Sequence, residues 1–234
     1  IAYLATDQKS EAKEKAEKEG KDWTVVDSEL LPKRLWVVTV AGSGDRTPRP
    51  VTALGERSAW EFDWSPDGQN LVATVTDLPR TDDGYMLRKV LVLATAVEPP
   101  ASREIAGIVG KVDQVAWSLD GKWIGWRGGV DASDPFSGSV FIAPAGGGPA
   151  TNVTGSRPES VNRIAWLKDG RLAWVAVRGT KTFASAVDPV RPGAIVDIVG
   201  GGGESFTSIS FSADGLRMAA TAGAADGPAE VHVA

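Results

Sequence analysis

One short pattern recurs four times along the chain and constrains its fold more than any other feature of the sequence. In each copy an aromatic residue stands three positions before an Asp-Gly pair. Successive aromatic residues are 53, 49 and 45 positions apart. A period of about 40 to 50 residues that contains several short strands is typical of a β-propeller blade. The aromatic residues are Trp64, Trp117, Trp166 and Phe211, and the pairs are Asp67-Gly68, Asp120-Gly121, Asp169-Gly170 and Asp214-Gly215.

The residues on either side of each pair indicate two strands joined by a tight turn. Apolar runs such as 71–75 and 172–177 follow the pair, and alternating apolar residues precede it. Glycine accepts a positive φ without a Cβ clash, and aspartate hydrogen-bonds the neighbouring backbone, so Asp-Gly between apolar runs predicts a hairpin. The four aspartates could instead form a shared ligand site. The sequence favours turn chemistry over that alternative.

Further apolar runs complete a four-stranded antiparallel meander in each repeat. Third strands are expected at 35–40, 90–93, 139–143 and 230–233, and weaker fourth strands at 49–52, 150–154 and 195–199. We therefore predict an all-β fold, a single β-propeller domain over residues 1–234 with about five blades. The expected blades are a partial blade at 1–55, three blades at 56–108, 109–157 and 158–203, and a partial blade at 204–234. Because the two ends do not complete one another, we expect a segment of a larger propeller.

Composition agrees with this fold and excludes several classes of function. The 234 residues include 27 Gly and 14 Pro, which favours many turns and few long helices. A formal net charge of -5 argues against nucleic acid as a partner. There is no cysteine, so disulfides and thiolate metal sites are excluded. No membrane span or targeting segment is visible, and we expect a soluble protein of the cytoplasm or periplasm, the sequence leaving that choice open.

The first blade carries an insert at residues 8–33 that interrupts the repeat. Residues 9–21 are almost all Lys, Glu and Ala, which predicts a short solvated helix that ends near Gly20. We expect Trp23–Asp27 to form an extra strand that returns to the blade. The insert is either a docking element or an exposed excursion, and the sequence favours the second interpretation.

Other segments that suggest a binding site have simpler interpretations. The excursions 76–89 and 128–138 are rich in Asp and Arg, but neither has the ligand spacing of a calcium loop, so solvated loops are favoured. The Gly-rich segments 41–44 and 145–148 lack the lysine and helix start of a phosphate-binding loop and are expected to be turns. Asn152 begins a possible glycosylation sequon.

Residues suited to catalysis are scarce. The only histidine is His232, near the C-terminal end, and its position favours a surface residue over a catalytic base. No Gly-x-Ser-x-Gly nucleophile elbow occurs. We therefore predict no catalytic, metal-binding or cofactor-binding residues in this chain, and no cofactor.

The repeat resembles the Asp-Gly propeller repeats of two groups, the prolyl oligopeptidase family of serine peptidases and the TolB translocation protein. The resemblance rests on the Trp-Ser-Pro-Asp-Gly segment at 64–68 and the Leu-Trp-Val-Val strand at 35–38. The opening residues 1–7, the insert, and the segments 22–27 and 34–38 look most like the N-terminal propeller of acylaminoacyl-peptidase and dipeptidyl-peptidase members. The resemblance covers nearly the whole chain.

The peptidase resemblance implies a propeller that caps an α/β-hydrolase domain and restricts access of substrates to it. Its partners would be the hydrolase domain of the same protein and, transiently, a peptide substrate, with neither nucleic acid nor a membrane span involved. That family keeps its catalytic triad in the hydrolase domain, and no residue of this sequence matches it. The alternative is a TolB-like module that binds a protein partner in the cell envelope.

Overall fold

The structure, a computed structural model, describes most of the chain. The described residues are 1–21, 23, 25–40, 42, 45–96, 99–105, 107–108, 110–133, 137–155, 157–202, 205–212, 217–224 and 227–233, with the backbone alone at residue 207. They form five antiparallel sheets, two short α-helices, α1 (Glu11–Lys18) and α2 (Thr81–Met86), and one 3-10 turn, η1 (Thr52–Leu54). None of the helices in these residues is long and apolar enough to span a membrane.

Each sheet is built from strands that are consecutive in the sequence, with three sheets of four strands between two sheets of three. The first sheet has β1 (Ala2–Thr6), β2 (Lys33–Val37) and β3 (Arg49–Pro50); the second has β4 (Ser58–Trp64), β5 (Asn70–Thr76), β6 (Lys89–Ala94) and β7 (Ser102–Glu104); the third has β8 (Val112–Trp117), β9 (Trp123–Gly128), β10 (Ser139–Pro144) and β11 (Thr151–Asn152); the fourth has β12 (Ser160–Trp166), β13 (Leu172–Arg178), β14 (Lys181–Val187) and β15 (Val196–Gly200); and the fifth has β16 (Ser205–Phe211), β17 (Met218–Gly223) and β18 (Glu230–Val233).

The three Asp-Gly pairs that lie in the described residues make the turns between the first two strands of their sheets. In the second sheet, Ser65 Oγ donates to Asp67 Oδ1 at 2.5 Å, and the same oxygen accepts from the backbone N–H of Gln69 at 2.9 Å. The backbone N–H of Gly68 closes the turn on Ser65 O at 2.9 Å. Gly68 adopts φ +69°, a conformation that an L-residue with a Cβ rarely takes. The turn chemistry that the sequence favoured is therefore what holds these hairpins.

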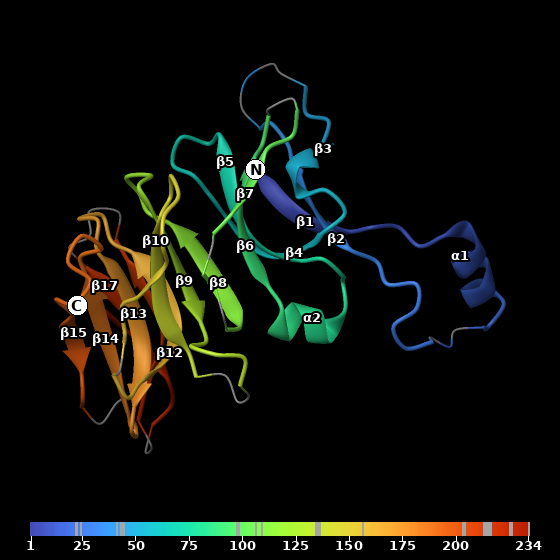
Figure 1. Cartoon of the computed structure of the whole chain (residues 1–234). Helices are drawn as coiled ribbons and strands as arrows, with labels where there is room; N and C mark the ends of the chain where they lie inside the picture. Colours follow the sequence, from blue (N-terminus) through green and yellow to red (C-terminus); the bar gives the residue numbers. More distant parts are fainter. Residues whose placement is uncertain are drawn as a thin grey trace.

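The core lies between neighbouring sheets rather than within any one of them. Fully buried apolar side chains join the first sheet to the second, as with Leu35 and Leu71, and smaller clusters such as that of Val175 and Ile209 join the fourth to the fifth. The inner strands β4, β8, β12 and β16 contact one another in that order. Figure 1 shows the five sheets following one another in chain order. The predicted all-β propeller of about five antiparallel blades is confirmed.

Side chains also hydrogen-bond from one inner strand to the backbone of the next. Asp63 Oδ2 on β4 accepts from the backbone N–H of Trp117 on β8 at 2.8 Å. Gln114 on β8 donates to Ile164 O on β12 and accepts from its N–H, both at 2.9 Å. These bonds fix the position of each inner strand, along its length, relative to the inner strand of the next sheet. Apolar packing alone specifies that position only weakly.

Every inner strand has one irregularity at the same place in the repeat. Pairing with the second strand shifts register between Ala59 and Glu61 in β4, and at equivalent points in β8, β12 and β16. Such bulges bend a strand and redirect the side chains beside them. In β4 the redirected residue is Trp60, and in β8 the bulge contains Asp113.

Residues 7–32, here called the arm, leave the first sheet between β1 and β2 and carry α1. The two strands pair from Ala2 opposite Val37 to Thr6 opposite Lys33, so the arm starts and ends at one end of the sheet. Figure 1 shows the arm pointing away from the sheets. Ser10 caps α1 by accepting from the backbone N–H of Lys13 at 3.2 Å, and the helix has no buried residue. The helix begins and ends inside its predicted range.

The extra strand predicted at Trp23–Asp27 is wrong. Among the described residues of that segment, Val25 O accepts from both the N–H and the hydroxyl of Ser28, at 3.1 and 2.9 Å, which closes a turn. Asp27 has φ +58° and Glu29 φ +52°, so the backbone there cannot continue as a strand. The alternation of Trp23 and Val25 suggested a strand, but no strand among the described residues pairs with this part of the arm.

Candidate functional site

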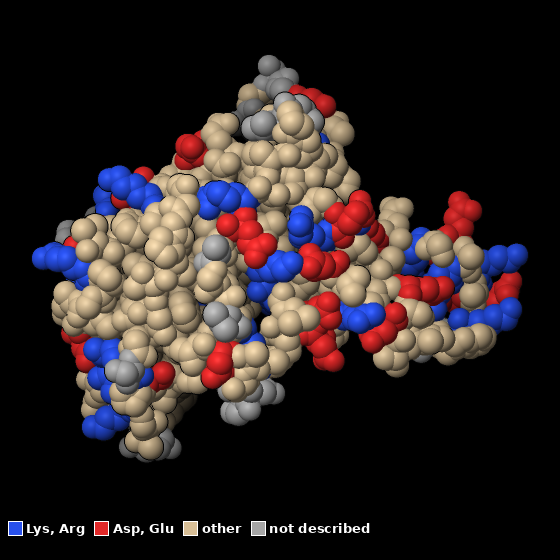
Figure 2. Space-filling model, viewed as in Figure 1, with Lys and Arg blue, Asp and Glu red and all other residues tan. Residues whose placement is uncertain are grey.

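Charged side chains gather at one end of the sheets, where β1 passes to β2 in the first sheet and the second strand passes to the third in the others; it is here called the arm end. The connecting segments there are the arm, 77–88, 129–138, 179–180 and 224–229. The Asp-Gly turns lie at the opposite end of each sheet. Figure 2 shows basic and acidic side chains side by side across the surface that leads to the arm. Four arginines organise this end, one from each of the first four sheets or its connections: Arg34, Arg88, Arg127 and Arg178.

In the first sheet, one arginine is satisfied by two carboxylates. Arg34 Nε donates to Asp7 Oδ2 at 2.9 Å, and its Nη2 donates to Glu56 Oε2 at 3.2 Å. Its Nη1 donates to Gly55 O at 2.9 Å. Asp7 follows β1 and Glu56 precedes β4, so Arg34 connects the first sheet to the start of the second. This guanidinium is fully engaged within the chain.

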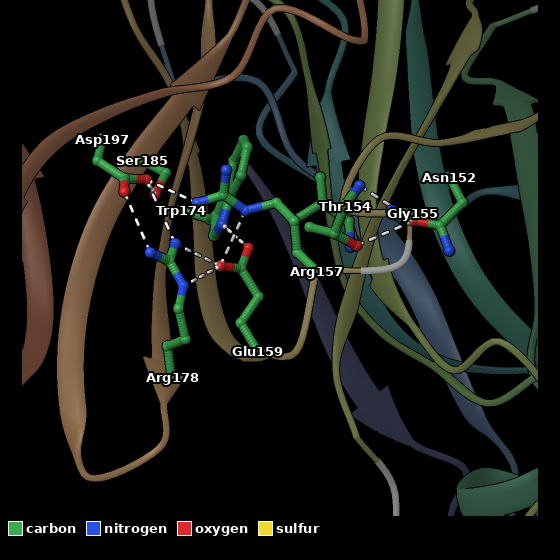
Figure 3. Close-up of polar contacts among 10 residues, drawn as sticks. Asn152, Thr154, Gly155, Arg157, Glu159, Trp174, Arg178, Ser185 and Asp197 are labelled. Carbon is green, nitrogen blue, oxygen red and sulfur yellow. Dashed lines mark hydrogen bonds and ion pairs between the residues drawn. The ribbon is translucent and has the colours of Figure 1, made fainter.

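In the fourth sheet, a buried glutamate is surrounded by donors (Figure 3). The side chain of Glu159 has no exposed area. It accepts from Trp174 Nε1 at 3.0 Å, from Arg157 Nε at 3.2 Å and from Arg178 Nη2 at 2.8 Å. A buried carboxylate is stable only when paired and hydrogen-bonded in this way. Glu159 therefore holds the loop before β12 against β13.

A second carboxylate completes this network on the solvent side. Asp197 of β15 accepts from Arg157 Nη2 at 2.7 Å, from Arg178 Nη1 at 3.1 Å and from Ser185 Oγ at 2.7 Å. The hydrogen bond from Arg178 is the main reason that the pKa of Asp197 falls to about 2. The Arg178 guanidinium also lies over the ring of Phe183, 4.1 Å from its centroid. The two arginines and two carboxylates balance in charge, and their arrangement is structural.

Between the second and third sheets, two arginines meet at one carboxylate. Arg88 Nη1 lies 3.7 Å from Asp113 Oδ1, and Arg127 Nη2 forms an ion pair with Asp113 Oδ2. Burial lowers the pKa of Arg88, and the pKa of Arg127 is lowered by burial and by the positive charge of Arg88. A cavity of about 140 Å³ lies beside them. Its lining residues are Gly84, Tyr85, Arg88, Lys111, Val112, Asp113 and Arg127.

The residues singled out in the sequence lie away from the arm end. Asp120 and Asp169 each accept from a backbone N–H two residues on, both at 3.0 Å, so each serves its own turn. The glycines of these turns, Gly121 and Gly170, have φ +76° and +87°. The structure brings none of the described motif aspartates together. Asp214 and Gly215 lie outside the described residues.

The motif aromatics occupy corresponding places on the inner strands but are buried to different degrees. Trp117 is 7% exposed, and its Nε1 donates to Gly121 O at 3.1 Å. Trp64, Trp166 and Phe211 are partly buried and pack against the apolar clusters on either side. All four contact apolar clusters, and Trp117 is the most enclosed.

Groups with catalytic or metal-binding potential are few in the part of the chain that the structure describes. It contains no group of three His, Cys, Asp or Glu side chains that could hold a metal ion. His232 lies on β18 and is exposed. Asn152 uses its side-chain oxygen to accept from the N–H groups of Thr154 and Gly155, at 3.1 and 3.0 Å (Figure 3). That amide therefore stabilises a turn.

The arginines of the arm end are the residues that sequence reasoning missed. The excursion containing Arg88 was interpreted as a solvated loop, yet the Arg88 side chain is only 16% exposed and α2 forms just before it. A signal was present in Arg127 and Arg178, which interrupt or end otherwise apolar strand runs. Charged residues at such positions are rarely buried unless they are paired.

Comparison with known proteins agrees with the architecture. No protein-family model matches the sequence, and no curated protein sequence does. Solved structures do match. A putative TolB from Agrobacterium tumefaciens is 17% identical, with a TM-score of 0.57, over 80% of this chain and 61% of that one. The Pyrococcus horikoshii acylaminoacyl peptidase is 12% identical, with a TM-score of 0.63, over 100% of this chain and 34% of that one.

A third match is a Mycobacterium tuberculosis puromycin-hydrolyzing peptidase, 15% identical with a TM-score of 0.61, over 98% of this chain and 36% of that one. At these identities the likeness shows the fold. The protein is a β-propeller. Its particular form is the one found in TolB and in the acylaminoacyl and dipeptidyl peptidase structures, and the chain spans about a third of the length of the peptidases that it matches.

Proposed function

We propose that this chain is the non-catalytic propeller domain of a serine peptidase of the prolyl oligopeptidase family, where it caps an α/β-hydrolase domain and gates the entry of peptides. The observation that carries the proposal is the extent of the structural match. Four peptidase structures match over 98 to 100% of this chain, with TM-scores of 0.61 to 0.64, and a putative dipeptidyl aminopeptidase IV from Bacteroides ovatus matches over 87%, with a TM-score of 0.57. The two TolB structures match over 80 and 86% of this chain, with TM-scores of 0.57 and 0.56 respectively.

The chemistry of the chain supports a gating role over a catalytic one. The sequence has no cysteine, a single histidine and no nucleophile elbow, so the nucleophile and base of a serine peptidase would lie in another domain. The contacts between successive blades are apolar packing and hydrogen bonds such as that of Asp63 to Trp117. A rigid array of this kind suits the exclusion of large substrates.

The first test is the coding sequence around this segment. The proposal expects a downstream α/β-hydrolase domain with a Gly-x-Ser-x-Gly elbow. A small upstream α/β domain, with no hydrolase after the propeller, would instead support a TolB-like module. The purified chain alone is expected to leave chromogenic aminoacyl substrates intact and to resist an active-site serine probe.

The second test measures gating in the whole protein. Cleavage is compared for peptides from dipeptides to chains long enough to fold, and kcat/KM is expected to fall steeply with size. Asp63→Asn, which weakens a bond between two inner strands, should relax the dependence on size, whereas Asp169→Asn at an outer turn should not. Equal rates for all sizes would contradict the gate.

A further inference from the structure

The arm end contains a buried guanidinium nitrogen of Arg88, between the second and third sheets, that no described residue satisfies. Arg34 has two carboxylates, and Arg178 has two. Arg88 and Arg127 both lie beside Asp113, where Arg127 also donates to Val161 O at 3.2 Å and the negative charge of Glu61 acts on Arg88. The comparison within one molecule shows what a saturated arginine looks like in this fold. Arg88 differs from it.

One nitrogen of Arg88 is left unsatisfied. Its Nη1 is buried and has no hydrogen-bond partner among the described residues, since Asp113 Oδ1 is 3.7 Å away. A buried guanidinium N–H without a partner is costly, and such groups in folded proteins usually have a ligand, a water or an ion as partner. The cavity of about 140 Å³ lies directly beside it.

The position of Arg88 is fixed by the elements around it. Its guanidinium lies 5.1 Å from the ring centroid of Trp60, the residue redirected by the bulge in β4, and its Nε donates to Gly84 O of α2. Trp60 Nε1 in turn donates to Thr76 Oγ1 at 3.0 Å. A Cβ at Gly84 would lie 2.2 Å from the Trp60 ring, so only glycine lets α2 approach this closely. The site is therefore preorganised on rigid elements.

Two further basic side chains, Arg127 and Lys111, line the cavity together with the carboxylate of Asp113. Arg127 enters from β9, and the bulge in β8 presents Asp113 between the two guanidinium groups. Lys111 is 2% exposed, and its Nζ lies 4.2 Å from the ring centroid of Tyr85, which is half exposed at the rim. Planar guanidinium groups with paired donors bind oxyanions such as carboxylates in a bidentate manner. The small volume excludes anything larger than one such group.

We propose that the cavity formed by Arg88, Arg127, Lys111 and Tyr85 is a binding site for a single carboxylate of a peptide, either its C-terminus or an acidic side chain. The anion would supply an acceptor for Arg88 Nη1 and offset the repulsion between Arg88 and Arg127. That the carboxylate belongs to a peptide rests on the proposed function, whereas the oxyanion site rests on the geometry alone.

The test measures binding to this chain without any hydrolase domain. The indole Nε1–H signal of Trp60, assigned with Trp60→Phe, is followed by NMR at constant ionic strength during titration with three probes: an N-acetylated dipeptide with a free C-terminal carboxylate, its C-terminal amide, and inorganic phosphate. The free acid should give a saturable shift and the amide should not. Arg88→Gln should weaken binding of the free acid about tenfold or more.

Arg171→Gln is the matched control, because it removes the same charge from an exposed arginine at the Asp-Gly end. It should bind the free acid as the unaltered chain does. If Arg88→Gln does not fold, Arg88→Lys keeps the charge but loses the paired donors, and it should also bind more weakly. Equal binding of acid and amide, equal binding by Arg88→Gln, or saturation by phosphate alone would overturn the proposal.

This outcome is separable from that of the proposed function. If the gene encodes no hydrolase domain, the peptidase assignment fails, but a carboxylate site measured by NMR would still stand. A peptidase that gates its substrates but shows no saturable shift would keep the assignment and remove the site.

Discussion

Trp117 shows at the scale of one residue how the repeat is held together. Its ring is buried in the cluster between the second and third sheets, its indole N–H donates to Gly121 O in its own turn, and its backbone N–H donates to Asp63 on the neighbouring blade. One side chain thus serves the core, the hairpin and, through its backbone, the contact between blades. Trp64 occupies the same place in the repeat but is less buried.

Replacing Trp117 tests this role. Trp117→Ala should lower the free energy of unfolding by about 3 to 5 kcal/mol, because it leaves a large cavity and removes the indole donor. Trp117→Phe keeps most of the apolar volume and should lose less, and Trp64→Ala should lie between the two. Urea denaturation followed by far-UV circular dichroism gives the three values. A loss below about 1 kcal/mol for Trp117→Ala would refute the packing role.

At the scale of elements, the network around Glu159 ties a loop to three strands of the fourth sheet. Glu159→Gln keeps the size of the side chain but leaves Arg157 and Arg178 without their buried counter-charge. We expect a loss of about 3 kcal/mol in the free energy of unfolding, because removing one partner of a buried pair leaves the other charge buried without a counter-charge. Asp188→Asn, at an exposed turn after β14, is the control and should change little. Equal stability of the two variants would contradict the structural role.

Asp197 makes the same network sensitive to acid. Its pKa of about 2 in the folded protein lies below the ordinary value of about 3.9, so the ionised carboxylate stabilises the fold fully above about pH 4 and progressively less as the pH falls toward 2. The difference in unfolding free energy between the unaltered chain and Asp197→Asn should therefore shrink on acidification. Urea denaturation at pH 5 and at about pH 2.5 measures it. A difference that stays constant with pH would show that Asp197 is not the titrating group.

The elements also show what could and could not be predicted from the sequence. The strand–turn–strand units were predictable because alternation and an Asp-Gly pair act over a few residues, as at Trp64 to Val75. The arm was predicted well in its helix and wrongly at Trp23–Asp27, where alternation was present but a pairing strand was not. The meeting of Arg88 with Arg127 was out of reach, because it depends on the register of two blades and on bulges that no local pattern specifies.

At the scale of the molecule, stability should be graded along the row of blades. Two small apolar clusters, each with three buried residues, lie between the fourth and fifth sheets, and every residue of β18 is exposed. The clusters between the first four sheets are larger. Repeat proteins lose protection first where a neighbouring unit contributes least.

Hydrogen exchange measures this gradient directly. Amide protons of α1 and β18 should exchange fastest, and those of β5, β9 and β13, which lie inside their sheets, slowest. Mass spectrometry of peptic fragments from the monomeric chain resolves these segments. Protection in β18 equal to that in β9 would show that the fifth sheet is as firmly held as the third.

The arm has a consequence for the covalent chain itself. Four of its five lysines, all but Lys13, are exposed around α1. The strands on either side of the arm, β1 and β2, are nevertheless joined by five pairs of facing residues and by packing of Leu4 against the first core cluster. A single tryptic cut in α1 would therefore divide the polypeptide without dividing the propeller. The short N-terminal piece should stay bound as a strand, so that denaturing gels show two fragments where native gels show one particle. The same place should accept the insertion of a foreign domain, because nothing in the sheets depends on the continuity of the arm.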